Sequence, residues 1–201
     1  MTNPALLGAV LTRESLRTRL RGKNGKADLV VTPILDEKQI GDGSIDVSLG
    51  TQFITNLRPN VGQIDPKELT SEHIRRFQKS VVVPFRESSV LHPGGFLLGA
   101  TLEFIALPTD LCGFVLSRSG YGRAGLLIAT ATYIHPGWKG CLTLELENLG
   151  EVPIVLRPGS YVGQLVLMHA EAISQPLLKS IPVGPAFSNL SEDPRWEKLR
   201  H

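Results

Sequence analysis

Cysteine is scarce in this sequence, which has only Cys112 and Cys141 among its 201 residues. The two thiols are far apart and form no CxxC pair, so a disulfide scaffold and a cysteine-rich zinc site are both excluded. The simplest interpretation of each is a small, buried, apolar side chain.

Long hydrophobic runs are also missing. No segment approaches the roughly 18 consecutive apolar residues that a membrane helix requires. An apolar patch at residues 5–11 has no positive charge before it and no clear small-residue cleavage site after it, unlike a signal peptide. We therefore expect a cytoplasmic protein with no membrane partner.

Neither sign of charge is in large excess, since 21 Lys and Arg face 19 Asp and Glu and the net charge is +2. The two signs are interspersed, whereas nucleic-acid binding requires a concentrated basic stripe. A few arginines could still bind one small anion. The 42% apolar and 20% charged residues are typical of a globular chain, and we expect one domain over residues 1–201.

Short strands with glycine and proline between them dominate what is present. We predict strands at residues 29–34, 45–49, 52–55, 80–84, 96–98, 103–106, 113–116, 126–130, 141–146, 154–156 and 161–168. Such spacing indicates a mainly β fold, either a sandwich, a jelly roll or a barrel.

One or two short helices accompany these strands. Thr12 can cap the first, Leu16 and Leu20 give it an apolar side, and Gly22 follows its last turn. A second is predicted at 66–77, beginning at a proline. The strand pattern fades after about residue 170, and we expect 171–201 to form a C-terminal arm or lid.

The most informative segment, Ser-Arg-Ser-Gly-Tyr-Gly-Arg-Ala-Gly at 117–125, follows an apolar strand. Its glycines let a ligand approach the backbone, and its serines and arginines donate hydrogen bonds suited to phosphate oxygens. The pattern predicts an oligophosphate-binding loop. A flexible hairpin with solvated arginines is the alternative.

A second segment, HPGWKG at 135–140, is a tight turn that leads into the strand CLTLELEN at 141–148. Strand alternation places Leu142, Leu144 and Leu146 on one face, with Thr143 and two glutamates on the other. By spacing alone, both glutamates would simply face water.

Resemblance to a known family changes that interpretation. The runs SRSGYGRAGL, ATATYIHPGWKGCLTLELEN and LRPGSYVGQLVL resemble the dCTP deaminase branch of the dUTPase-like superfamily. GSIDVSLGTQF and FLLGATLEFIALPTDLCGFV are similar to the same family in order and spacing. The resemblance covers roughly residues 8–170 and implies a distorted β-barrel or jelly roll that converts dCTP to dUTP and ammonia.

The resemblance also implies a homotrimer with active sites at subunit boundaries. Arg118, Ser119 and Arg123 would contact the triphosphate and help to place the catalytic water, beside the backbone of Ala131. Glu145 would be the general base. The remaining nucleotide-contacting positions that it implies are Gly120, His135, Thr143, Leu144 and Gln164. Magnesium would be bound only through the nucleotide phosphates, with no metal held by the protein and no zinc.

This assignment suits the chemistry. Hydrolytic deamination requires a water activated against the ring carbon that bears the amino group, and a proton for the departing ammonia. One carboxylate can do both in turn, and proton transfer of this kind is worth about 10²–10⁴-fold in rate. Burial would help by raising the pKa of the carboxyl group toward neutrality.

Four rival interpretations differ in what they require. A dUTPase has an apolar residue in place of Glu145 and a glycine-rich C-terminal arm, which this sequence lacks. A zinc-dependent deaminase needs HxE and PCxxC patterns, and neither is present. A bifunctional enzyme that releases dUMP and a catalytically silent nucleotide-binding protein both stay open.

Two departures from the family pattern limit what can be transferred. His135 stands where many members have an aspartate that contacts the sugar, and a local role in the turn is its alternative. The tail lacks the family's tyrosines and its Gln-Gly-rich segment, although Lys179, Gly184 and Pro185 could be remnants. The number of phosphates preferred is therefore open, with a monophosphate or a modified cytosine as the alternative substrates.

Overall fold

The computed structural model describes residues 8–22, 28–57, 77–129 and 133–174. Residues 175–201 of the predicted arm lie outside this range, and so does all but the last residue of the helix predicted at 66–77. No helix within the described part of the chain is long and apolar enough to cross a membrane.

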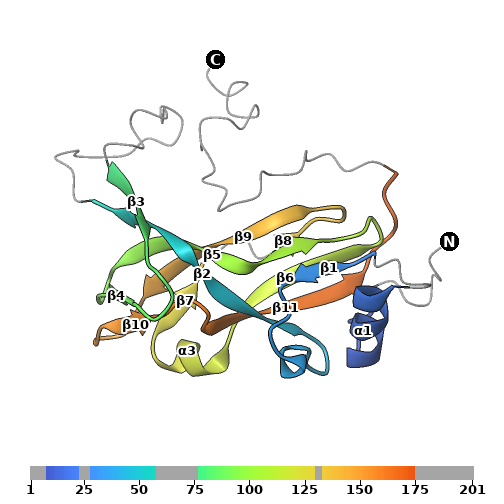
Figure 1. The fold of residues 1–201 in the computed structure, drawn as a ribbon, viewed down its shortest axis with the longest axis horizontal. Coiled ribbons are helices and arrows are strands. Elements are labelled where there is room, and N and C mark those ends of the chain that lie inside the picture. The colour runs from blue at the N-terminus through green and yellow to red at the C-terminus, as the bar shows by residue number, and fades with distance from the viewer. Residues whose placement is uncertain (1–7, 23–27, 58–76, 130–132, 175–201) are drawn as a thin grey trace, which may run out of the picture.

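Strands make up about half of the described chain. Their bounds are β1 (Val30–Thr32), β2 (Ile45–Asn56), β3 (Gln78–Val82), β4 (Ser89–Leu91), β5 (Phe96–Ala106), β6 (Leu111–Ser117), β7 (Leu126–Ile128), β8 (Tyr133–Ile134), β9 (Lys139–Asn148), β10 (Ile154–Leu156) and β11 (Tyr161–His169). Nine of them form one sheet with the order β7-β9-β5-β2-β11-β6-β8, to which β1 adds on β5 and β3 on β2. Strands β4 and β10 form a separate antiparallel pair (Figure 1).

The large sheet curls so that strands far apart in its order meet again. Strand β7 stands at one end of the order and β6 near the other. The backbone N–H of Ile128 in β7 nevertheless donates to the hydroxyl of Ser117 at the end of β6, at 3.3 Å. The result is a half-barrel, and the prediction of a mainly β fold is confirmed.

Two pairs of predicted strands are single strands in the structure. Segments 45–49 and 52–55 join in β2, while 96–98 and 103–106 join in β5. Gly50 lies inside β2 because β5 approaches it closely: an added Cβ would lie 3.0 Å from the carbonyl oxygen of Ala100. The gap predicted between residues 49 and 52 is therefore wrong, and Gly50 marks a close backbone contact. Strands β4 and β8 were not predicted.

The first helix is confirmed as α1 (Arg13–Arg21). The hydroxyl of Thr12 accepts a hydrogen bond from the backbone N–H of Ser15, and Gly22 ends the helix with a φ of 76°. Leu16 is fully buried against the sheet core. A short 3-10 helix, η2 (Glu37–Gln39), precedes β2 and is capped by Asp36.

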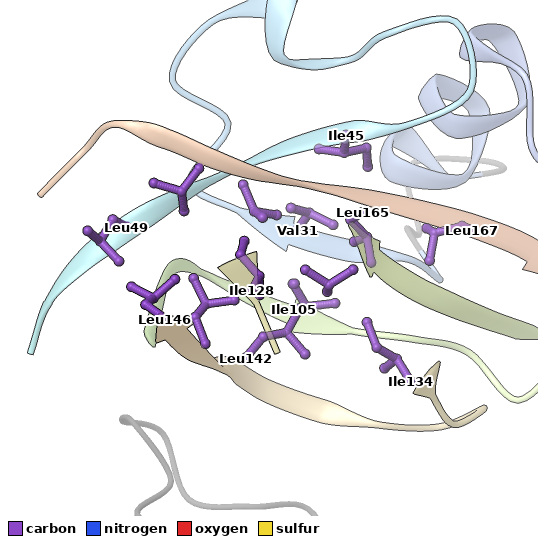
Figure 2. Close-up of a cluster of buried hydrophobic side chains, with 14 of the residues drawn as sticks. Val31, Ile45, Leu49, Ile105, Ile128, Ile134, Leu142, Leu146, Leu165 and Leu167 are labelled. Carbon is purple, nitrogen blue, oxygen red and sulfur yellow. The ribbon is translucent and has the colours of Figure 1, made fainter. Parts of the chain in front are cut away.

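The core lies on the concave side of the sheet and is almost wholly aliphatic. Figure 2 shows side chains from opposite parts of the sheet converging, among them Leu49 of β2, Ile105 of β5, Leu146 of β9 and Leu165 of β11. Along β9, buried and half-buried residues alternate as predicted. The apolar residues therefore occupy the inner face, and Thr143, Glu145 and Glu147 are left on the outer face.

Candidate active site

Residues 117–125, called here the Gly-Ser-Arg segment, form neither an open loop nor a hairpin, the two structures that their sequence suggested. The segment forms one turn of helix, α3 (Ser119–Arg123), between β6 and β7. The backbone N–H of Gly122 donates to the carbonyl oxygen of Arg118 at 3.0 Å and closes this turn. Ser119 and Arg123 are both exposed, and Arg123 forms no ion pair with any described residue.

The three glycines of this segment differ in what they do. Gly125 has a φ of +92°, and an added Cβ would lie 2.6 Å from the backbone nitrogen of Gly150, so the fold itself requires glycine there. At Gly120 and Gly122 an added Cβ would meet no atom of the described residues within 4 Å. The surface beside α3 is therefore open to whatever approaches this chain from outside.

Strand β7 connects α3 to the strand that carries Glu145. On one side, the backbone N–H of Ile128 donates to the hydroxyl of Ser117, immediately before the segment. On the other, the N–H of Ala129 donates to the carbonyl oxygen of Glu145 at 2.8 Å. Residues 117 and 145, which are distant in the sequence, are thus held to adjacent residues of one short segment.

Glu145 lies on the outer face of β9 and is half-buried. Its neighbour across the strand pair is Leu98 of β5, on the side away from β7. Burial raises the pKa of the Glu145 carboxyl group above its ordinary value. This is the shift that a general base acting near neutral pH requires.

A second group of predicted site residues gathers where β2, β11 and the start of α3 meet. The guanidinium of Arg118 forms an ion pair with Asp46, with Nη1 3.2 Å from Oδ2, and lies over the ring of Tyr161 at 5.7 Å from its centroid. The side-chain amide of Gln164 donates to Oδ1 of the same aspartate at 3.4 Å. Strand register explains the cluster, because Gln164 stands directly opposite Asp46.

Sequence reasoning missed Asp46. It belongs to the GSIDVSLGTQF run that carried part of the family resemblance, but no role was given to it. A signal was present, since the alternation of Ile45, Asp46 and Val47 places this carboxylate on the face of the strand opposite its two apolar neighbours. Its partners Arg118 and Gln164, however, lie far along the chain, and only the sheet topology brings them to Asp46.

The remaining predicted positions are spread over three places. His135 is exposed just after β8, where its ring meets the Tyr133 ring edge-on with centroids 4.8 Å apart. The side chain of Leu144 is fully buried in the core and points away from Glu145, so its predicted contact with the nucleotide could involve only its backbone. Thr143 lies on the outer face beside Glu145, and Ala131 falls outside the described residues.

Metal ligands do not cluster in the part of the chain that the structure describes: no group of three or more His, Cys, Asp or Glu side chains is placed to hold an ion. Asp46, which forms an ion pair with Arg118, also accepts a hydrogen bond from Gln164. This arrangement is compatible with a magnesium ion bound by nucleotide phosphates alone, which stays a prediction.

Comparison with known proteins identifies the family of the part of the chain that carries these residues. Residues 10–170 match the family model described as dCTP deaminase-like. The chain is 36% identical over 183 residues to a dCTP deaminase of Halorubrum lacusprofundi, covering 85% of this chain and 88% of the relative. It is 38% identical over 159 residues to a dUMP-forming dCTP deaminase of Methanobrevibacter smithii, covering 79% of each.

Among solved structures, the chain resembles the 2′-deoxycytidine 5′-triphosphate deaminase of Agrobacterium tumefaciens. The TM-score is 0.61 at 25% identity, over 81% of this chain and 46% of that longer one. The dUTPase-like fold inferred from the sequence is thereby confirmed. With the family model matching most of its length, this chain belongs to the dCTP deaminase-like family.

Proposed function

We propose that this protein is a dCTP deaminase that hydrolyses the C4–amino bond of cytosine without zinc, using Glu145 as the general base. The observation that carries the assignment of the base is the position of this carboxylate. It lies half-buried on the outer face of β9, with a raised pKa, and β7 connects its strand to α3. The family and its named relatives support the activity.

The proposed reaction conserves atoms with one water and one carboxylate. Glu145 takes a proton from water as the water oxygen bonds to C4 of the ring. The carboxyl passes that proton to ring N3, which receives the electron pair of the C4–N3 double bond. The carboxylate then takes the second proton from the new C4 hydroxyl and delivers it to the amino group as the C4–N bond breaks, so that ammonia leaves, C4 becomes a carbonyl and N3 keeps its hydrogen. Ser119 and the backbone of Ala131 would position the water, and Arg118 and Arg123 would bind the triphosphate.

The assembly that we propose is a homotrimer with active sites at subunit boundaries. Exposed Ser119 and Arg123 and the open surroundings of Gly120 support it, because they leave α3 accessible to a second chain. The outer face near Glu145 also carries apolar side chains, with Phe96 36% and Leu127 41% exposed. Both stand opposite Glu147 in the strand pairing and could be covered by a neighbouring subunit. A cytoplasmic location and magnesium on the substrate phosphates stay predictions.

A bifunctional enzyme is the second candidate, because several relatives are named as dUMP-forming dCTP deaminases. Product analysis with dCTP, dCMP and dUTP separates the possibilities. A simple deaminase yields dUTP and ammonia from dCTP, whereas a bifunctional one yields dUMP and pyrophosphate. No ammonia from dCTP would contradict the proposal and indicate a silent binder.

Full activity after chelation, once magnesium is restored, is the expected result if zinc is not required.

The raised pKa of Glu145 predicts how activity depends on pH. A general base must be deprotonated, so kcat/KM for dCTP should fall as pH drops through a pKa above that of an ordinary glutamate. The measurement is the acid limb of the pH profile. The matched control is Glu147→Gln, on the same face two residues along β9, which should leave that limb in place. An acid limb with a pKa at or below that of an ordinary glutamate would contradict the role of Glu145.

A further inference from the structure

Asp46 connects two side chains that the proposed site assigns to the nucleotide. One carboxylate oxygen faces Arg118 at 3.2 Å and the other accepts from Gln164 at 3.4 Å. The side chain of Asp46 is only 16% exposed and that of Arg118 38% exposed. A partly buried ion pair restricts a long arginine side chain more than a solvated surface pair does.

The backbone around Asp46 is held in turn by a buried carboxylate, Glu103 of β5. Its side chain is fully buried and accepts three hydrogen bonds: from the amide of Gln39 at 2.9 Å, and from the backbone N–H and the hydroxyl of Ser48, both at 2.8 Å. The Gln39 amide also donates to the backbone carbonyl of Asp46 at 2.8 Å. Glu103 therefore restrains β2 at Asp46 and at Ser48.

Ser48, the second of these positions, is connected to Arg118 through Tyr161. Ser48 stands opposite Tyr161 in the pairing of β2 with β11, and the Tyr161 ring lies under the Arg118 guanidinium. Asp46 thus comes from backbone that the Glu103 network holds, and Tyr161 comes from the strand that pairs with that backbone. A buried carboxylate is costly unless its hydrogen bonds are satisfied, and burial does raise the pKa of Glu103 against the opposing effect of its donors. The proposed reaction does not use this acid directly.

We infer that Asp46 is a positioning residue that orients Arg118 toward the substrate phosphates, and that buried Glu103 fixes Asp46 in the place from which it does so. This inference rests on the proposed phosphate-binding role of Arg118. Preorganisation is the physical basis, because an arginine that is already oriented loses less rotamer freedom when an oligophosphate binds. The carboxylate also places a negative charge near the phosphates. If this charge acted only by repulsion, removing it would strengthen phosphate binding, whereas the loss of an orienting partner for Arg118 would weaken it.

The experiment measures how strongly inorganic tripolyphosphate inhibits dCTP deamination, which probes the phosphate-binding part of the site alone. Asp46→Asn should raise the inhibition constant about tenfold, within the range of couplings between contacting residues. It should also raise KM for dCTP and change kcat little. Glu103→Gln should act in the same direction, and if that variant does not fold, Asp46→Asn decides the question.

The matched control is Asp110→Asn. Asp110 forms a bidentate, partly buried pair with Arg19 of α1, with distances of 2.7 and 3.1 Å, but it is not part of the Arg118 cluster. Loss of that pair should lower the melting temperature without changing inhibition by tripolyphosphate. A purely structural role for Asp46 would give the same result as this control, and that outcome would overturn the inference.

A double-mutant cycle separates the inference from the function on which it rests. In an Arg118→Ala background, Asp46→Asn should add no further loss, because the side chain that it orients is gone. If Arg118→Ala raises the inhibition constant but Asp46→Asn leaves it unchanged or lowers it, the positioning role is wrong and the site assignment survives. If Arg118→Ala has no effect, the phosphate-binding assignment and the positioning role are both wrong.

Discussion

Replacing Glu145 with glutamine is expected to abolish ammonia release from dCTP while leaving nucleotide binding nearly unchanged. The amide keeps the size of the side chain and can still form hydrogen bonds, but it can neither take a proton from water nor return one to the departing ammonia. The loss of proton transfer should lower kcat by about 10²–10⁴-fold. Ammonia release under saturating dCTP measures the first effect, and calorimetric titration with dCTP measures the second.

Glu147→Gln is the matched control for this experiment. It makes the same chemical change on the same strand and face, at a residue with the same half-buried environment. Turnover close to that of the unaltered protein is expected from it. Unchanged turnover in Glu145→Gln would eliminate Glu145 as the base, and equal losses in both variants would point to a general disturbance of β9.

Arg123→Ala should weaken the binding of dCTP far more than that of deoxycytidine. Arg123 is exposed on α3, without an ion-pair partner among the described residues, and its guanidinium suits phosphate oxygens. Hydrogen bonds to charged groups are worth about 1.5–3 kcal/mol, so the dissociation constant for dCTP should rise about 10- to 150-fold. Deoxycytidine has no phosphate and should be nearly unaffected.

A control for surface charge is available in Arg21→Ala. Arg21 is also exposed, on the last turn of α1, which lies well apart from α3 (Figure 1). Removing it changes the net charge equally but should leave both dissociation constants unchanged. If Arg123→Ala weakened the binding of dCTP and deoxycytidine to the same degree, its assignment to the phosphates would be wrong.

Local sequence signals predicted those features that depend on a few neighbouring residues. The Thr12 cap and Gly22 gave the bounds of α1 because capping and chain termination are local effects. Alternation along 141–148 placed Glu145 on the outer face of β9 because side chains on a strand change sides at every residue. The predictions failed between residues 49 and 52, where two strands were predicted but one strand continues through Gly50, which allows β5 to pack closely.

What the sequence by itself determined is the set of chemical groups and the family: a carboxylate on an alternating strand, two arginines in a glycine-rich segment, and a match over residues 10–170. Only the tertiary structure decided which groups act together. It folded the Gly-Ser-Arg segment into α3 and connected it through β7 to the strand of Glu145. It also placed Asp46 and Tyr161 against Arg118, with Gln164 bound to the same aspartate. The physical reason is that strand pairing and the curl of a sheet join residues that are remote along the chain, and no short-range pattern records those contacts.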